Sequence, residues 1–353
     1  MSSAGDDVPH VALGTLLREW GRIGCIGFGG PPTHIRLLRD LCVRRRNWLT
    51  DVEFEDAIAA CNLLPGPAST QLAIFCAWRV RGRLGALLGG AAFIVPGLIV
   101  ILALAALFLA GSPPQWVLGA GAGAGAAVAA VAVNAGWDLL TASWQRRRHV
   151  YRWTAYLVAG GVAAATIGPW LVLVLLGCGL FEVGVQQPRT PPRELHTRGG
   201  RAAALPIAVG SFSAGNLGSL AWVALKVGAL SYGGGFVIIP LMQSDAVDHY
   251  NWMSDGQFLN AVALGQVTPG PVVQTVAVVG YAAAGLGGGI LASIVAFSPS
   301  FTFVLLGAHR FDRLRTNPRV RAFLEGAGPA AIGAILGSAI PLARALSEGW
   351  QYA

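Results

Sequence analysis

Two long uncharged stretches constrain this chain more than any other feature. Leu84 to Ala110 run for 27 residues without a charged side chain, and Gln115 to Trp137 run for 23. Each is longer than the roughly 20 residues that a helix needs to cross a bilayer. Only 12% of the 353 residues are charged and 54% are hydrophobic, which is typical of polytopic membrane proteins. The sequence therefore predicts an all-α, polytopic integral membrane protein.

Several function classes are excluded by the same sequence. The formal charge of +8 does not indicate nucleic-acid binding, because the arginines cluster in short loops between apolar segments, as topology signals do. The five cysteines lack metal-site spacing and are interpreted as small buried hydrophobic residues. The chain has no P-loop, no dinucleotide fingerprint after a strand and no nucleophile triad. We therefore expect that the protein is not an enzyme, holds no cofactor or metal and does not use ATP to drive transport. Because the first ten residues are polar, we also expect no cleaved signal peptide.

An internal repeat organises the chain. A single offset of 204 residues places Pro65-Gly66-Pro67 on Pro269-Gly270-Pro271, and it also aligns Trp48 with Trp252. We therefore predict an N-terminal repeat at 11–185 and a C-terminal repeat at 215–353, joined by a polar linker at 186–214 that is rich in Pro and Arg.

The arginine distribution indicates how the repeats are related. The first half has basic loops at 36–46 and 79–83, whereas their counterparts at 240–250 and 283–287 are acidic or neutral. Conversely, the basic loop at 310–321 corresponds to an uncharged loop in the first half. Because cytoplasmic loops collect positive charge, this exchange predicts two inverted-topology repeats.

Each PGP motif is predicted to lie at the tip of a re-entrant helical hairpin. Residues 55–63 and 68–80 are each too short to cross the bilayer, and 257–281 form the equivalent hairpin. Thr50 and Ser254 are placed to cap the helices that enter the hairpins. Full crossings are expected near 11–30, 84–110, 115–140, 150–168, 169–185, 217–235, 286–309 and 322–346.

The helix starts after the PGP motifs are candidate anion sites. Proline suits the first turn of a helix, and the first backbone amides of such a half-helix carry the positive end of its dipole. The alternative is that both prolines only kink helices for packing. The expected substrate-binding residues at the two tips are Pro65, Gly66, Pro67, Ala68, Ser69, Thr70, Gln71, Pro269, Gly270, Pro271, Gln274 and Thr275.

A second motif, "GRIGCIGFGGPPTH" at 21–34, aligns with "LKVGALSYGGGFVI" at 225–238 and places Arg22 on Lys226, the only lysine. Basic side chains inside membrane segments are functional candidates, and two of them would suit a doubly charged anion, although both could snorkel to an interface. Glycines permit a sharp turn here, and nearby polar side chains add hydrogen-bonding groups. The further candidates for substrate binding are Gly29, Gly30, His34, Ser231, Gly233 and Gly234.

Three acidic residues could relay a proton in a coupled transporter. Asp138, Glu182 and Glu325 lie in or near apolar segments, where an ionisable group is costly. Each also lies near the end of a predicted segment, so a structural role stays open.

The motifs "FGGPPTHI", "LLPGPASTQLAI", "SYGGGFVIIPLMQ" and "GQVTPGPVVQTVAVVGYAAAG" resemble those of the chromate ion transporter (CHR) family, the ChrA-type efflux proteins. The resemblance covers both halves. It differs at Gly27, where a serine is expected in the family motif. The resemblance implies a multi-pass protein of the bacterial inner membrane that exports chromate and confers chromate resistance. It also implies an antiporter that is driven by an ion gradient, namely the proton gradient.

The expected partners are therefore chromate or the chemically similar sulfate as substrate, and the lipid bilayer. A homodimer is an assembly that the sequence leaves open. The alternative functions are a permease for sulfate or another oxyanion, and an anion channel.

Overall fold

The computed structural model describes residues 11–62, 64, 66–110, 114–166, 171–186, 216–231, 238–308, 317–344 and 346, and in these ranges the chain is helical without a strand. The all-α prediction is confirmed for this part of the chain. The helices are α1 (Leu13–Ile26), α2 (Pro31–Arg39), the π-helix η1 (Asp40–Arg45), α3 (Asp51–Cys61), α4 (Ala68–Phe108), α5 (Gln115–Arg146), α6 (Val150–Thr166), α7 (Leu171–Gln186), α8 (Asn216–Leu230), α9 (Ile238–Gln243), the π-helix η3 (Ser244–His249), α10 (Asp255–Val267), the 3-10 helix η4 (Val272–Gln274), α11 (Thr275–Gly307) and α13 (Pro318–Arg344).

The same local features recur in both halves. The two π-helices start 204 residues apart, and each is followed by an asparagine with positive φ, Asn47 or Asn251. Thr50 and Ser254 then form complete capping boxes at the starts of α3 and α10. The predicted caps are confirmed, and each satisfies backbone amides that the helix itself leaves unpaired.

The long helices α4 and α11 each contain a sharp break. The path of α4 is interrupted at Arg81 and Gly82, and that of α11 at Ala284 and Gly285. A Cβ at Gly85 would lie 2.3 Å from the carbonyl oxygen of Ala77, so the residues after the break run back along the residues before it. The 41 residues of α4 are therefore two helices. We call the parts after the breaks, 83–108 and 286–307, the crossing helices.

Among the residues that the structure describes, four helices are long and apolar enough to cross a membrane: Ala68–Phe108, Ala122–Gln145, Val272–Gly307 and Pro318–Arg344. They include the crossings expected near 84–110, 115–140, 286–309 and 322–346. The other expected crossings correspond to α1, α6, α7 and α8, which have 14, 17, 16 and 15 residues. These four are shorter than the roughly 20 residues of an untilted crossing.

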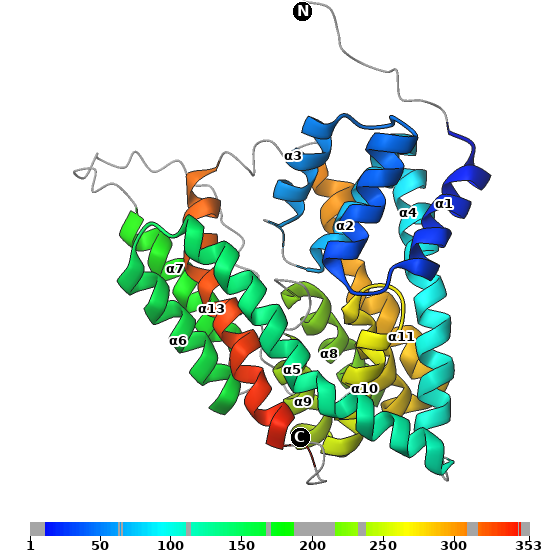
Figure 1. Cartoon of the computed structure of the whole chain (residues 1–353), viewed down its shortest axis with the longest axis vertical. Coiled ribbons are helices and arrows are strands. Elements are labelled where there is room, and N and C mark those ends of the chain that lie inside the picture. The colour runs from blue at the N-terminus through cyan, green and yellow to red at the C-terminus, as the bar shows by residue number, and fades with distance from the viewer. Residues whose placement is uncertain are drawn as a thin grey trace, which may run out of the picture.

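The helices form two bundles (Figure 1). In one bundle α13 packs against α5, α6 and α7, and in the other α1 packs on α4 while α8 packs on α11. The bundles meet where α5 packs on α10. The helices α1, α2 and α3 lie in the upper part of the view, whereas α8, α9 and α10 lie lower.

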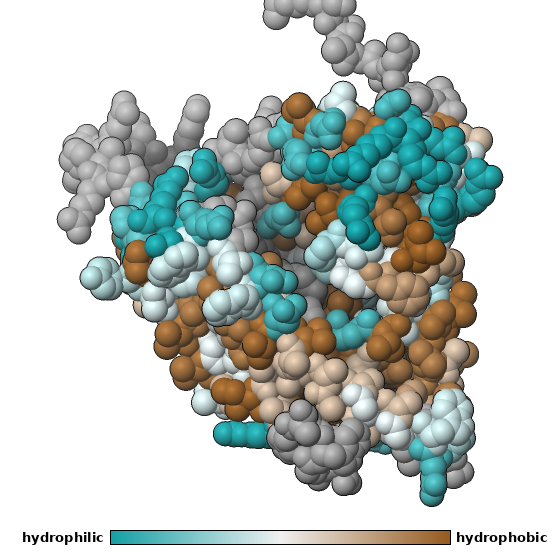
Figure 2. Space-filling view, viewed as in Figure 1, coloured by the Kyte–Doolittle hydropathy of each residue, from teal (hydrophilic) through white to brown (hydrophobic). Residues whose placement is uncertain are grey.

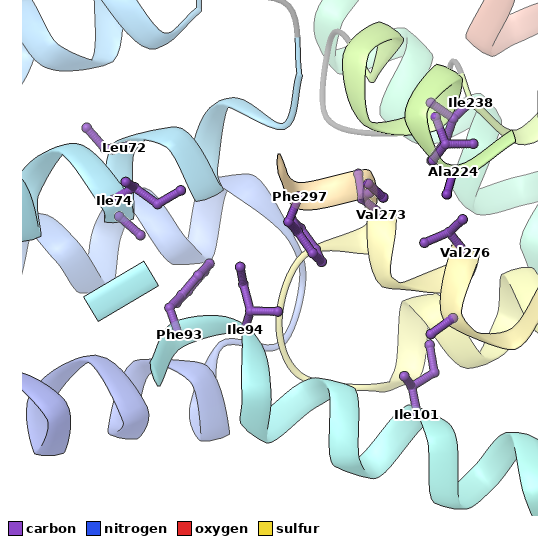
Figure 3. Packing of buried hydrophobic residues seen from close by; sticks show 14 of the residues in the cluster. Leu72, Ile74, Phe93, Ile94, Ile101, Ala224, Ile238, Val273, Val276 and Phe297 are labelled. Atoms are coloured by element: carbon purple, nitrogen blue, oxygen red, sulfur yellow. The ribbon is translucent and has the colours of Figure 1, made fainter. Parts of the chain in front are cut away.

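The halves share one apolar core. Figure 3 shows Phe93 and Ile94 of α4 on one side of Phe297 of α11, with Val273 beyond it. All four side chains are at most 6% exposed. On the outer surface, hydrophilic residues gather at the upper end of the molecule, over α1 to α3, and hydrophobic residues dominate below them (Figure 2). An apolar band of this kind is what a bilayer covers.

Candidate functional site

Each PGP motif forms a turn in front of a helix. Gly66 has a φ of +117° and Gly270 one of +103°, values that L residues rarely adopt. Pro67 and Pro271 follow as extended residues directly before α4 and η4. We call residues 65–71 the first tip and residues 269–274 the second tip.

The backbone amides available at the tips are fewer than the sequence indicates. The N–H groups of Thr70 and Gln71 donate to the carbonyl of Pro67 at 3.0 Å, and the N–H of Gln274 donates to that of Pro271 at 2.9 Å. The amides of Thr70 and Gln274 are thus engaged. In the first tip, this leaves Ala68 and Ser69, which precede any intrahelical acceptor.

The second tip packs on the first half. The backbone N–H of Gly270 donates to the carbonyl of Gly27 at 3.0 Å, and the side-chain amide of Gln274 donates to the carbonyl of Ile94 at 2.7 Å. A Cβ at Gly97 would lie 2.1 Å from the carbonyl oxygen of Pro269. Only glycine allows the tip to approach the first crossing helix at this point.

The first tip packs on the second half in the equivalent place. A Cβ at Gly66 would lie 3.3 Å from both the hydroxyl of Ser300 and the carbonyl oxygen of Gly228. Ser300 follows Pro299 in the second crossing helix, as Gly97 follows Pro96 in the first. The contact is therefore reciprocal, because each tip meets the crossing helix of the other half.

The register of the repeat changes by one residue inside the tips. Gly66 and Gly270 stand 204 residues apart, whereas Pro96 and Pro299 stand 203 apart. Gln71 and Gln274 occupy equivalent places, because the side-chain amide of each lies within about 3.3 Å of a Cβ placed on the glycine of its own tip. The change from an offset of 204 to one of 203 therefore falls between the tip glycine and this glutamine. Gln71 therefore corresponds to Gln274, not to Thr275 as the ungapped offset of 204 implies. The first tip is one residue longer than the second.

His34 connects the two tips. Its side chain is fully buried, with Nε2 2.9 Å from the carbonyl oxygen of Gly27, which also accepts the amide of Gly270. Its Nδ1 lies 3.2 Å from the hydroxyl oxygen of Ser69. Because a carbonyl oxygen only accepts, the neutral ring carries its proton on Nε2 and the hydroxyl of Ser69 donates to Nδ1. A hydrogen-bonded path thus runs from one tip to the other.

The structure does not bring Arg22 and Lys226 together at the tips. Arg22 is exposed on the outer face of α1, opposite the buried face that contains Trp20. The Nζ of Lys226 lies 2.6 Å from Oδ2 of Asp245 in η3, and these side chains are 22% and 11% exposed. In this conformation the charge of Lys226 is neutralised by its own half.

A matching ion pair with exchanged charges lies in the first half. Glu19 of α1 bonds Arg46 at 2.6 Å, directly after η1. In both halves the first helix is thus tied to the region of the π-helix. The acid is on the helix in the first half and on the π-helix in the second.

The remaining candidates occupy several places. Gly29 and Gly30 have positive φ and form the turn between α1 and α2, while Ser231 is fully buried at the end of α8. The hydroxyl of Thr275 donates to the carbonyl of Val272 at 2.8 Å. Three further candidates, Pro65, Gly233 and Gly234, lie outside the described residues.

The proposed relay acids lie in the other bundle. Glu182 is 3% exposed and accepts hydrogen bonds from Tyr156 at 2.7 Å and from Gln186 at 2.6 Å, and Arg152 lies 3.1 Å from it. Gln186 also donates to Glu325, so the network joins α6, α7 and α13. Asp138 is exposed on α5.

Sequence reasoning missed two parts of the site, Ser300 and Asp245. Ser300 could have been found from Pro96 and Pro299, the only prolines in the two crossing helices, had one gap been allowed in the repeat. Asp245 gave no such signal, because its counterpart in the first half is Leu41.

Broken helices that meet at a buried polar centre between two related halves define a membrane protein with the architecture of a transporter. The chain belongs to the chromate transporter family, which matches residues 14–183 and 218–353. It is 33% identical to the chromate transport protein of Cupriavidus metallidurans over 95% of this chain and 84% of that protein.

Two further relatives extend this comparison. The chromate transport protein of Pseudomonas aeruginosa is 30% identical over 96% of this chain and 83% of its own length. An uncharacterized transporter of Methanocaldococcus jannaschii is 26% identical over 84% of this chain and 76% of its own. No solved structure matches the chain.

Proposed function

We propose that this protein is a secondary transporter that exports chromate across the bacterial inner membrane, is driven by the proton gradient and confers chromate resistance. Family membership and relatives named as chromate transport proteins support chromate as the substrate. The observation that carries the proposal is the reciprocal contact of two glycine-bent tips with the crossing helix of the opposite half.

Three observations support inverted repeats. The tip contacts are reciprocal, as an approximate two-fold relation between the halves would produce. The helices α1, α2 and α3 lie higher in the view than their counterparts α8, α9 and α10 (Figure 1). The ion pairs Glu19–Arg46 and Lys226–Asp245 have exchanged charges, as expected if equivalent loops face opposite sides of a membrane with positive charge inside.

The break in each long helix supports re-entrant hairpins. Residues 68–80 end at the break, and the crossing helix then runs back beside them. A hairpin formed by α3 and residues 68–80 would enter the membrane and leave it on the same side. Backbone that is not helical is tolerated at membrane depth where protein surrounds it, and the described tip residues are mostly buried.

The tips would supply donors to a tetrahedral dianion without a neighbouring cation. Amides at the start of a helix bind oxyanions readily, and Thr70 adds an unpartnered hydroxyl group in the same turn of the first tip. Each tip lies on the crossing helix of the other half. A rocking motion of one half against the other would therefore shift each tip along the crossing helix that it contacts. Such motion gives alternating access.

Transport into proteoliposomes of defined orientation tests the proposal. With an imposed pH gradient, the wild-type protein is expected to move chromate in preference to sulfate and molybdate, with a rate that saturates. Equal transport rates with and without the pH gradient would show that transport is not coupled to protons. A rate that never saturates, with measurable conductance, would indicate a channel.

A matched pair of variants ties that transport to the tips. Gly66→Ala forces a residue with a side chain into a φ of +117° and is expected to abolish transport. Gly328→Ala lies in helix α13 with nothing within 4 Å of the added Cβ and is expected to transport normally. If both variants confer full chromate resistance on a sensitive host, the tip is not the transport site.

A further inference from the structure

Three buried hydroxyl groups on the elements around the first tip have no hydrogen-bond partner. They are Oγ1 of Thr70, Oγ of Ser231 and Oγ of Ser300, and none of them bonds any atom in the described part of the chain. All three side chains are 0% exposed. Buried hydroxyls are nearly always bonded, and one that is not calls for an unseen ligand or water.

These hydroxyls belong to elements that meet at the first tip. Thr70 lies in the first turn of α4, directly after the tip glycine and its proline. Ser300 Oγ is 3.3 Å from a Cβ placed on Gly66, at the same distance as the carbonyl oxygen of Gly228. Ser231 comes three residues after Gly228, at the end of α8. Elements of both halves that carry unpartnered hydroxyls thus meet at the first tip.

The second tip carries none of these hydroxyls. The residues equivalent to Ser231 and Ser300 are Gly27 and Gly97, at offsets of 204 and 203. Both positions are occupied by the second tip itself: Gly27 accepts the amide of Gly270, and Gly97 lies against the carbonyl of Pro269. The backbone of the second tip thus fills the positions that correspond to those of Ser231 and Ser300.

The one unpartnered polar atom at the second tip has the wrong chemistry for an anion. Gln274 donates its side-chain Nε2 to the carbonyl of Ile94, which fixes the orientation of the amide. Its Oε1 is then buried without a donor in the described chain. An amide oxygen, whether of Gln274 or of Gln71 in the first tip, can only accept a hydrogen bond and offers an oxyanion no donor. The tips differ in their free hydroxyls, which can donate to an oxyanion.

We propose that the two tips are functionally unequal: a single oxyanion binds at the first tip, held by the hydroxyls of Thr70, Ser231 and Ser300, and the second tip is a fixed support. This inference rests on the proposed function and locates its binding site. It selects one tip of a pair that the repeat alone makes equivalent. The longer first tip, with Ser69 and Thr70 where the second has Val272 and Val273, is consistent with this choice.

The test compares hydroxyls of the same helix that differ in whether they are bonded. Ser300→Ala removes an unpartnered hydroxyl from α11. Ser293→Ala removes a hydroxyl of the same helix that is 1% exposed and donates to the carbonyl of Gly289 at 3.0 Å. Thr70→Val provides a second, isosteric change at the tip. Binding of chromate and of sulfate to the purified full-length protein is measured by isothermal titration calorimetry, and Tm is measured without anion.

Ser300→Ala and Thr70→Val are each expected to raise the Kd of the anion by at least tenfold, as loss of a hydrogen bond to a charged group does. Without anion, their Tm should equal or exceed that of the wild type, because an unsatisfied buried group has been removed. Ser293→Ala should keep the wild-type Kd and lower the Tm. A merely structural role for Ser300 predicts a lower Tm instead.

The outcomes separate this inference from the proposed function. If the wild-type protein binds an oxyanion and both tip variants bind it within twofold of the wild type, the assignment to the first tip is overturned while the transporter proposal stands. If the wild-type protein binds and transports neither chromate, sulfate nor molybdate, both proposals fall.

Discussion

Replacing Lys226 separates a role in folding from a role in substrate binding. In Lys226→Met, Asp245 loses its partner at 2.6 Å while its side chain stays only 11% exposed. Removing one member of a buried ion pair costs about 3–5 kcal/mol. Since Lys226 is 22% exposed, the lower end applies, on the order of 3 kcal/mol. At roughly 2 °C per kcal/mol for a larger chain, Tm should fall by about 6 °C.

The double variant Lys226→Met/Asp245→Leu is the decisive companion. It places at position 245 the residue that the first half has in the equivalent position, Leu41, and it leaves no unpaired charge. Apolar replacement of a whole buried pair is often neutral, so Tm is expected to return to within about 2 °C of the wild type. Since Lys226 is engaged within its own half, chromate transport should return with it.

Thermal unfolding in detergent and transport in proteoliposomes are measured on the same preparations. If the double variant regains the wild-type Tm but transports no chromate, Lys226 acts on the substrate directly, and the structural reasoning is refuted. A single variant with an unchanged Tm would equally refute the idea that Asp245 depends on this pair.

Three further results are expected. His34→Leu should lower both Tm and transport because it breaks the path between the tips, whereas His34→Gln keeps a donor for the same carbonyl and should retain more of both; equal loss in the two variants would contradict this. Gly24→Ala places a Cβ 2.6 Å from a backbone oxygen of α4 and should destabilise the protein by about 1–3 kcal/mol, while Gly14→Ala in the same helix meets nothing within 4 Å and should not lower Tm. Thr50→Ala should cost about 1 kcal/mol through loss of the cap. Burial acts to raise the pKa of Glu53 in that capping box, but hydrogen bonds from Thr50 and the nearby Arg79 outweigh it and lower the pKa. The stabilisation from Glu53 is therefore present above its ordinary pKa and is lost as pH falls through the lowered value. A titration of Tm toward acid pH in the wild type and in Glu53→Gln would detect this loss.

The helical fold and the caps that recur in both halves could be predicted because they depend on local chemistry. Uncharged stretches of 23 and 27 residues leave few alternatives to membrane helices. The caps at Thr50 and Ser254 follow from side chains that reach amides three residues away. Proline and glycine restrict the backbone wherever they stand, so the PGP turns were visible without any knowledge of packing.

The partners of charged groups could not be predicted in the same way. The alignment of Arg22 with Lys226 indicated a shared role, yet one side chain is exposed and the other bonds Asp245. Which face of a helix a side chain occupies depends on what packs against that helix, and periodicity in a uniformly apolar segment does not reveal it. Tertiary packing decided both positions.

The hydroxyl cluster also lay beyond the reach of sequence reasoning. Ser300 comes from a helix more than two hundred residues away from the first tip, and its relevance depends on a one-residue change of register. An ungapped comparison of the repeats hides that change, because the PGP motifs themselves align without it.

The reciprocal contact between tips and crossing helices has a consequence for how such a protein could assemble. Each half carries both members of the contact, a tip and the surface that receives a tip, so the surface of one half is self-complementary. A polypeptide consisting of one such half could therefore close the same contact with a second copy of itself. Fusion into one chain removes the need for identical halves, and this freedom allows one tip to keep its hydroxyl groups for a ligand while the other packs against the opposite half.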